Sequence, residues 1–299
     1  MNKRVLALGL TLLMLCSCGK QPDPEPSEEP SPTETGYAAT GWNNPDVPKY
    51  QLDQEAFLSL GGFTIYTAAN AASHIGIDVS TFQGEIDWPQ VKAAGVEFAM
   101  LRAGGRGYGP SGAIYEDGGF IQNLQGALGA GVEVGVYFFS QAVTEEEARE
   151  EAQSVLHWIS PYKITYPVVF DWETVEDAAA RTHNLDAETV TACAKAFCSE
   201  VEAAGHTAMV YFNRHQGYSV YNLAELGGYE FWLAGYTTIP DFAYDFQMWQ
   251  YSNTGTVPGI EGPVDLNICL VDYPEGSKAA AAAAAAEPEA DLEGSETDS

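Results

Sequence analysis

Apolar runs of strand length alternate with amphipathic helical stretches through most of the chain. The runs are rich in valine, phenylalanine and tyrosine, which favour strands. The predicted strands are residues 74–80, 98–104, 132–140, 166–173, 207–213, 229–236, 246–252 and 264–269. The predicted helices are residues 88–95, 117–130, 144–160 and 186–204, with a short one at about 218–226. This alternation indicates parallel strands joined by helical crossovers.

The number of strands and their burial predict an α/β barrel. The apolar runs are nearly continuous, as expected for strands that are buried on both faces. About eight strands in roughly two hundred residues favour closure into a barrel. Because the last third of the pattern contains little helix, we expect an irregular (β/α) barrel of about eight mostly parallel strands with fewer than eight helices. A doubly wound open sheet is the alternative.

Polar residues follow the predicted strands at the ends where a parallel barrel carries its chemistry. The residues at or just past these ends are Asp78, Arg102, Ser140, Asp171, Glu173, Asn213 and Tyr236. Asp265 is the exception, since it lies near the start of its strand. Either that strand runs in the opposite direction to the others, or its predicted boundary is misplaced.

The stretch YPVVFDWE at residues 166–173 places two acids at the end of one buried strand. Residues two apart on a strand point to the same side, so Asp171 and Glu173 face one way. Crowding two carboxyls raises the pKa of one of them or requires a partner. A catalytic pair gives a reason for this arrangement, and an acidic strand end that enters a solvated loop is the alternative.

Composition limits the class of partner. The chain has 299 residues, of which 45% are hydrophobic, enough for one large domain or two small ones. Its formal net charge of -29 argues against nucleic acid as a partner, because phosphate binding needs clustered lysine and arginine. Some of the acids lie in segment 274–299, which we expect to be a disordered alanine-rich tail.

The first 18 residues have the pattern of an export signal. Lys3 and Arg4 precede an apolar run at residues 5–15 that is too short to span a membrane. The run ends in LCSC, which resembles a bacterial lipobox and implies cleavage before Cys18 and a lipid on its sulfur. An ordinary secretory signal cut nearby is the alternative. In both cases we expect an exported protein, and with lipidation one anchored at the bacterial cell surface.

Two segments separate this signal from the predicted barrel. Residues 19–40 are rich in proline, glutamate and serine and predict a disordered acidic tether. Residues 41–73 contain apolar positions without a clear period, and we expect an N-terminal arm there.

Cofactor motifs are absent from the sequence. We interpret Cys193, Cys198 and Cys269 as small buried apolar residues, with a bridge from Cys269 to one of the others as the alternative. There is no CxxC or HExxH pattern, and the five histidines are scattered, so we expect no metal or other cofactor. GGRGYG at residues 104–109 has the wrong spacing for a dinucleotide loop, and we expect no nucleotide.

Eight stretches together, in this order, resemble the glycoside hydrolase family 25 lysozymes. They are residues 76–88, 102–109, 135–142, 166–173, 209–213, 231–236, 248–252 and 264–267. The resemblance covers about Ile75 to Val271, within a predicted catalytic domain at residues 74–273. It implies an irregular β/α barrel that cleaves the β-1,4 bond between N-acetylmuramic acid and N-acetylglucosamine in peptidoglycan.

The resemblance also implies roles for four acids. Glu173 corresponds to the acid that protonates the leaving oxygen, and Asp171 to the residue that assists the reacting sugar. Asp78 and Asp265 correspond to the other acids that line the groove. Glycosidic hydrolysis needs one protonated carboxyl and a second group that stabilises positive charge at the anomeric carbon. An ionised Asp171 would raise the pKa of Glu173, as a general acid requires.

Two stereochemical outcomes stay open from the sequence. In the preferred retaining route, Asp171 orients the substrate's own N-acetyl group, whose oxygen attacks the anomeric carbon, and Glu173 then activates water. In the inverting alternative, Asp78 or Asp265 activates water across a wider gap.

Further residues are candidates for substrate binding. Four aromatic residues fall near strand ends and correspond to groove positions in the family, with core packing as the alternative for each. They are Tyr137, Tyr211, Trp232 and Tyr236. Arg102 could pair with Asp78 to keep it ionised, or form an unrelated structural ion pair. Gln250 is a weaker candidate hydrogen-bond donor to the sugar.

Three functions compete on these features. The first is an active muramidase whose partner is the peptidoglycan glycan strand and which contacts the membrane only through its lipid. The second is a non-catalytic glycan-binding lipoprotein on the same fold. The third is a hydrolase of another N-acetylated β-1,4 glycan, such as chitin. Because none of the four acids is missing, the sequence favours a catalytic protein over a binding protein.

Overall fold

The computed structural model describes residues 44–273 of the chain. The predicted signal segment at residues 1–18 with its lipidation site Cys18, the tether at residues 19–40 and the tail at residues 274–299 lie outside the described residues. None of the helices within residues 44–273 is both long and apolar enough to cross a bilayer.

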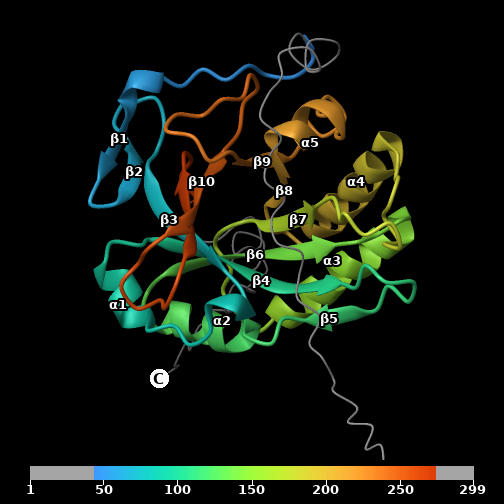
Figure 1. The fold of residues 1–299 in the computed structure, drawn as a ribbon, viewed down its shortest axis with the longest axis horizontal. Coiled ribbons are helices and arrows are strands. Elements are labelled where there is room, and N and C mark those ends of the chain that lie inside the picture. Colours follow the sequence, from blue (N-terminus) through green and yellow to red (C-terminus); the bar gives the residue numbers. More distant parts are fainter. Residues whose placement is uncertain (1–43, 274–299) are drawn as a thin grey trace, which may run out of the picture. The chain divides into compact units, whose positions relative to one another are not determined.

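Eight strands close into a barrel (Figure 1). Their order around the barrel is β3-β11-β10-β9-β8-β7-β6-β4, and pairing between β3 and β4 closes the ring. The bounds are β3 (His74–Val79), β4 (Phe98–Arg106), β6 (Glu133–Ser140), β7 (Val168–Trp172), β8 (Ala208–Asn213), β9 (Glu230–Ala234), β10 (Met248–Gly255) and β11 (Val264–Cys269). The predicted irregular barrel is therefore confirmed, and closure excludes the open sheet.

One strand of the barrel runs against the other seven. β11 is antiparallel to both of its neighbours, β10 and β3, whereas every other pair around the ring is parallel. The start of β11 therefore lies beside the carboxyl ends of the parallel strands, and Asp265 pairs directly with Asp78. Of the two explanations for the position of Asp265, the reversed strand direction is correct.

Five α-helices are present in the described part of the chain. They are α1 (Trp88–Ala93), α2 (Phe120–Gly129), α3 (Glu145–Ile159), α4 (Ala187–Ala203) and α5 (Arg214–Ser219). α2, α3 and α4 pack outside the strands β4, β6, β7 and β8. The short helix predicted at about 218–226 is misplaced. The helix begins at Arg214 because the side chain of Asn213, the last residue of β8, caps it.

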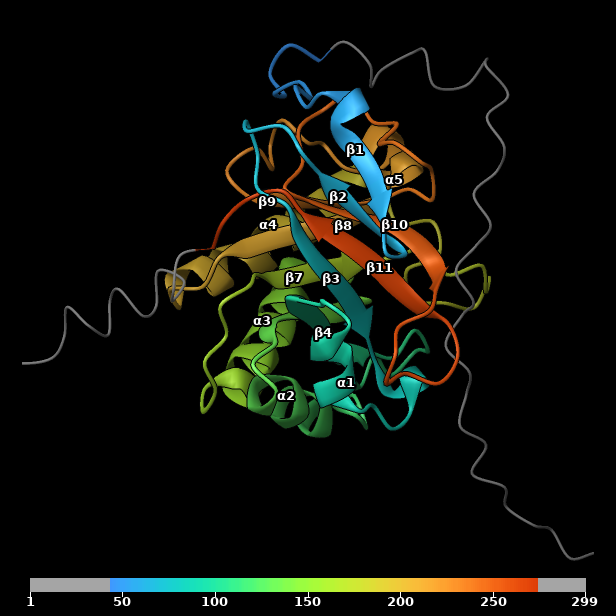
Figure 2. The same ribbon diagram turned by 90° about the vertical axis from the view of Figure 1, so that its left-hand side faces the viewer.

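A hairpin covers the side of the barrel that lacks helices (Figure 2). It consists of β1 (Phe57–Leu60) and β2 (Phe63–Tyr66). The ring of Phe57 meets Trp249 of β10 edge-on, with 5.5 Å between centroids. The backbone N–H of Thr64 donates to the hydroxyl of Tyr251 at 3.1 Å. The segment before the barrel thus replaces a helical layer. A further short strand, β5 (Ile114–Glu116), pairs antiparallel with the last three residues of β4.

Apolar side chains fill the interior of the barrel toward the amino ends of its parallel strands. The ring of Phe98, the first residue of β4, stacks on Tyr166 with 4.3 Å between centroids. Glycines at inward positions make room for these large side chains. A Cβ added at Gly76 would lie 2.1 Å from the ring of Phe98, and one at Gly135 would lie 2.6 Å from the side chain of Met100. The packed interior leaves only the opposite end of the barrel for polar groups.

The three described cysteines pack as apolar residues. Cys193 and Cys198 lie on the inner face of α4, and Cys269 lies inside the barrel. All three are buried and free. Their interpretation as small buried residues is confirmed, and no bridge joins Cys269 to either of the others.

Replacing Gly76 by alanine tests the close packing inside the barrel. We expect Gly76→Ala to destabilise the protein by about 2 kcal/mol, because the added methyl overpacks the ring of Phe98. Thermal unfolding should occur roughly 5 °C lower. Gly129→Ala is the matched control, since nothing lies within 4 Å of its Cβ position. Equal stability of the two variants would contradict the packing argument.

Candidate active site

The carboxyl end of the barrel brings together the four acids expected from the sequence. Asp171 is the second-last residue of β7, and Glu173 follows that strand directly. Asp78 is near the end of β3, beside Asp265. The negative charges of Glu173 and Asp78 both raise the pKa of Asp171. The four acids therefore form one electrostatically coupled group.

Asp78 and Asp265 form a carboxyl pair that holds one proton. Burial and the charge of Asp78 raise the pKa of Asp265 to about 9. Burial also raises the pKa of Asp78, while hydrogen bonds from Asn267, Gln250 and Asp265 oppose that rise. Asp265, whose pKa lies above neutral pH, therefore carries the proton and donates it in a hydrogen bond to Asp78.

Two amides complete the surroundings of Asp78. The Nε2 of Gln250 and the Nδ2 of Asn267 each donate to its Oδ2 at 2.8 Å. Gln250 and Asn267 are buried, with 3% and 0% of their surface exposed. Hydrogen bonds to a charged acceptor are among the stronger ones in proteins. They offset much of the cost of keeping the Asp78 carboxylate buried.

Asp171 is buried without a complete set of hydrogen bonds. No donor among the described residues reaches its Oδ1. Burial, followed by the charges of Glu173 and Asp78, raises its pKa well above the ordinary range, and Arg102 only partly offsets this. Burial thus favours the protonated form of Asp171, in contrast to the ionised carboxylate expected from the sequence. Asp171 is buried more deeply than Glu173 and so loses more hydration.

Glu173 lies at the edge of the site. Its side chain is half-buried, in contrast to the buried Asp171. This position gives its carboxyl access both to the interior carboxyls and to a molecule that enters from solvent. No group of three or more His, Cys, Asp or Glu side chains within residues 44–273 is arranged to hold a metal ion.

Two tyrosines are tied to the same amide that holds Asp78. The hydroxyls of Tyr211 and Tyr236 donate to the Oε1 of Gln250 at 3.1 and 3.0 Å. Gln250 therefore orients three side chains from its buried position instead of facing the solvent as a sugar donor. The Tyr236 side chain is 42% exposed and presents an aromatic surface at the rim.

Trp232 supports this site from inside the barrel. Its surface is only 2% exposed, and its indole N–H donates to the Oδ1 of Asn267 at 2.9 Å. The rings of Tyr137 and Tyr211 meet it at 6.1 and 4.9 Å between centroids. Packing, the alternative given above, is therefore the correct interpretation for Trp232. Tyr137 and Tyr211 are half-buried and stand over it.

Arg102 forms its buried ion pair with Asp117. Its Nε and Nη2 both lie 2.8 Å from Asp117 Oδ2. Asp78 is instead satisfied by amides, so the structural ion pair is the better of the two interpretations of Arg102. The ring of Phe82 covers the guanidinium at 5.0 Å, and 60% of the Phe82 surface is exposed.

Three residues of the site were missed in the sequence. Asn267 could have been found, because it lies two residues after Asp265 and so faces the same side of the strand. Phe82 follows the first predicted strand in the family-like stretch at residues 76–88. Asp117 is expected from the sequence as the start of a helix and as part of the loop and helix that resemble the family, but its pairing with Arg102 has no local sequence signal.

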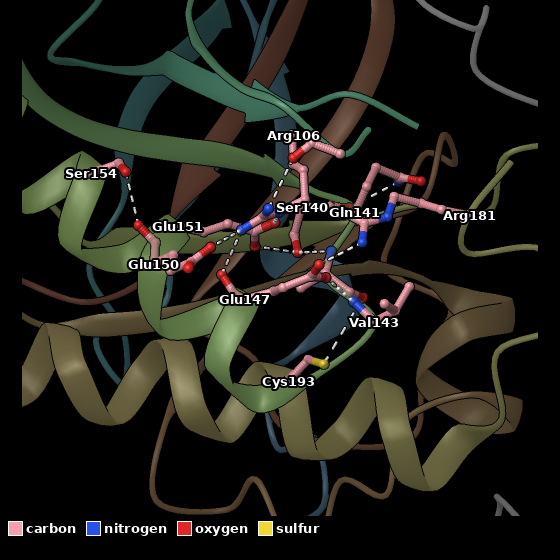
Figure 3. Close-up of polar contacts among 12 residues, drawn as sticks. Arg106, Ser140, Gln141, Val143, Glu147, Glu150, Glu151, Ser154, Arg181 and Cys193 are labelled. Atoms are coloured by element: carbon pink, nitrogen blue, oxygen red, sulfur yellow. Dashed lines mark hydrogen bonds and ion pairs between the residues drawn. The ribbon is translucent and has the colours of Figure 1, made fainter. Parts of the chain in front are cut away.

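A buried ion-pair network lies between the barrel and α3 (Figure 3). The carboxyl of Glu151 accepts from the Nε of Arg106 at 2.7 Å and from the hydroxyl of Ser140 at 2.6 Å. Burial raises the pKa of Glu151 to about 7 against these stabilising contacts. The Nη2 of Arg181 donates at 2.5 Å to the Oε1 of Glu147, which lies on α3 like Glu151. The network ties α3 to the ends of β4 and β6.

The fold and the carboxyl group together define a barrel with the chemistry of a glycosidase. A family model described as glycosyl hydrolases family 25 matches residues 77–260. The chain therefore belongs to glycosyl hydrolases family 25.

Similar proteins include Lysozyme M1 of Streptomyces globisporus, which is 29% identical over 202 residues that cover 64% of this chain and 66% of that protein. The autolysin LytC of Streptococcus pneumoniae, solved with a synthetic peptidoglycan ligand, has a TM-score of 0.60 and 22% identity, covering 71% of this chain and 52% of its own. The bacterial lysozyme of Streptomyces coelicolor has a TM-score of 0.51 and 26% identity. The match covers 70% of this chain and 95% of that chain. The chain spans less than two thirds of Lysozyme M1 and about half of LytC.

Asp265→Asn tests the protonated state of the carboxyl pair. Folded protein keeps the Asp265 proton up to about pH 9, whereas the unfolded chain loses it near pH 4. The folded state therefore binds more protons in this window, and wild-type stability falls as pH rises through it. Asparagine still offers Asp78 an N–H donor but does not titrate. We expect the unfolding temperature of the variant, relative to wild type, to rise on the order of 10 °C from pH 4 to pH 8.

Asp46→Asn, a change at an exposed carboxylate, is the control for this comparison. A difference between Asp265→Asn and wild type that stays constant from pH 4 to pH 8 would contradict a shared proton.

Proposed function

We propose that this protein is an exported lysozyme that hydrolyses the β-1,4 bond between N-acetylmuramic acid and N-acetylglucosamine in peptidoglycan. The observation that carries the proposal is the pair at the end of β7, a buried Asp171 with one unpartnered oxygen beside a more exposed Glu173. Membership of family 25 and the similarity to Lysozyme M1 support the substrate class.

Substrate binding redistributes the proton between the two acids of β7. The N–H of a substrate acetamide supplies the donor that Asp171 Oδ1 lacks among the described residues. A hydrogen bond to the charged form favours ionisation, so Asp171 loses its proton when that donor arrives. The proton then resides on Glu173, where a general acid is needed.

The retaining route follows from this state. Glu173 gives its proton to the glycosidic oxygen as the bond to the anomeric carbon breaks. The acetamide oxygen attacks that carbon and forms a cyclic oxazolinium ion, which ionised Asp171 stabilises through the acetamide N–H. Glu173, now a carboxylate, takes a proton from water, and the resulting hydroxide opens the ring at the anomeric carbon.

The carboxyl pair at the other side of the site favours this route over inversion. A general base must have a carboxylate oxygen available for a water proton. Asp265 carries a proton at neutral pH, and the Oδ2 of Asp78 already accepts from two amides. Neither acid is prepared to activate water, whereas Glu173 is.

A catalytic role also distinguishes this proposal from glycan binding alone. Binding needs aromatic surfaces and hydrogen bonds, but it does not need a coupled group of four acids whose burial is costly. The export signal and the lipid on Cys18 belong to the same proposal. They would place the enzyme at the cell surface, where its substrate lies. A hydrolase of another N-acetylated β-1,4 glycan is the remaining candidate.

Glu173→Gln tests the enzyme and the role of its acid together. Purified peptidoglycan is incubated with the full-length wild type and with the variant, and new reducing ends are identified by mass spectrometry. We expect muramic acid reducing ends from the wild type and a loss of rate of about 1000-fold or more in the variant, because glutamine cannot donate the proton.

Glu176→Gln is the control, since it makes the same chemical change at an exposed side chain three residues away. It should retain wild-type activity. No release by the wild type from peptidoglycan, with release from chitin, would move the protein to the other substrate class. Equal release by Glu173→Gln would remove Glu173 from the proposed role.

The anomeric form of the first product tests the retaining route. Proton NMR of a soluble glycan fragment, recorded during early turnover, should show the β anomer before mutarotation. An α anomer at the earliest times would show inversion and would assign the base to another acid of the site.

A further inference from the structure

The backbone that carries Glu173 leaves the sheet at a defined point. Pairing between β7 and β8 ends at Asp171 and Tyr211. The carbonyl of Trp172 lies beyond this last pair and cannot be satisfied by the β8 ladder. Instead, the Nε2 of Gln216 donates to it at 2.8 Å. A side chain of α5 thus continues the hydrogen bonding of the sheet by one residue.

Gln216 is itself held in one orientation. Its Oε1 accepts from the backbone N–H of Asn213 at 2.9 Å, and its own backbone N–H donates to the side chain of Asn213 at 2.9 Å. This reciprocal arrangement is a capping box at the start of α5. Because Gln216 is only 2% exposed and its oxygen is engaged, its amide nitrogen points at Trp172.

A second glutamine lies on the other side of Glu173. Gln141, which follows β6, is fully buried, and its Nε2 donates to the carbonyl of Ser140 at 2.9 Å. The same nitrogen lies 3.5 Å from the carbonyl of Glu173, a weak contact. Its Oε1 accepts from the hydroxyl of Thr182 at 2.6 Å. Figure 3 shows Gln141 beside Ser140, next to the Arg106–Glu151 network.

We propose that Gln216 is a positioning residue for the general acid of this enzyme, an inference that rests on the proposed function. The peptide between Trp172 and Glu173 is planar, so fixing the carbonyl of Trp172 also fixes the plane of the Glu173 N–H. This fixes the position of the Glu173 Cα, from which the catalytic side chain extends. Displacement of a catalytic group by about 1 Å can cost about 100-fold in rate.

The position of Gln216 separates this role from substrate binding. Gln216 is buried, and its amide contacts only backbone atoms of Asn213 and Trp172. Loss of the amide should therefore lower kcat and leave KM unchanged. A merely structural role would lower stability without a specific effect on turnover by the molecules that remain folded.

Two substitutions test the amide donor in the full-length protein. Gln216→Met keeps the length of the side chain and removes the hydrogen bond. We expect kcat on peptidoglycan to fall about 10- to 100-fold, with KM within about twofold of wild type. Gln125→Met, at an exposed glutamine of α2, is the matched control and should match wild type.

Gln216→Glu adds a pH-dependent rescue. The ionised carboxylate has no donor for the Trp172 carbonyl, whereas the protonated carboxyl has one. We expect the kcat deficit relative to wild type to shrink at least about fivefold as pH falls through the titration of the new carboxyl. The deficit of Gln216→Met should stay constant over the same range. If Gln216→Met fails to fold, the low-pH recovery of Gln216→Glu carries the test.

Hydrogen exchange distinguishes failure of this inference from failure of the proposed function. Backbone exchange of residues 172–175, followed by mass spectrometry, does not depend on activity. We expect it to be about 10-fold faster in Gln216→Met than in Gln125→Met. If the wild type releases no glycan but exchange accelerates, the anchoring by Gln216 stands and the proposed function fails. Unchanged exchange, or a loss confined to KM, would overturn the role of Gln216.

Discussion

Burial of carboxyl groups at one end of a closed barrel is the constraint on which the rest of the structure depends. Each buried charge needs a counterion, a donor or a proton. Asp78 receives two amide donors and the proton of Asp265. Asp171 differs, because its Oδ1 has no donor within residues 44–273 and burial raises the pKa of its carboxyl. Among the buried carboxyl groups of the site, Asp171 thus has an oxygen that lacks a donor, and the proposed substrate acetamide would supply it.

The scaffold around the site compensates for this costly group. Apolar rings fill the barrel from its amino end, and inward glycines allow them to approach closely. Trp232 extends this packed interior up to the polar layer, where its indole N–H orients Asn267. On the outside, the hairpin β1–β2 covers strands that lack helices, and the Arg106–Glu151 pair anchors α3. Rigid packing below and beside the acids holds them in place although their burial is unfavourable.

Local patterns could predict the strands, the barrel and the acids at its end, because burial on both faces leaves continuous apolar runs with polar residues after them. Strand direction has no such local pattern, so the position of Asp265 became clear only from the reversed β11. The burial of Trp232 and the pairing of Arg102 with Asp117 depend on neighbours distant in sequence. The raised pKa of Asp171 has no local sequence signal either, because its largest cause is burial, which depends on neighbours distant in the chain.

The difference in burial between Asp171 and Glu173 explains how two acids only two residues apart can have different proposed roles. Asp171 ends inside the barrel, where its Oδ1 has no donor among the described residues, and in the proposed mechanism its charge state responds to the donor that the substrate brings. Glu173 is two residues farther along, where pairing with β8 has ended and Gln216 donates to the carbonyl of Trp172. A group that transfers protons needs a fixed position but must be able to change its charge. The neutral amide of Gln216 fixes the backbone next to Glu173 without adding a charge. In the proposed mechanism, Gln216 therefore orients the general acid through the carbonyl of Trp172 and not through a charged contact of its own.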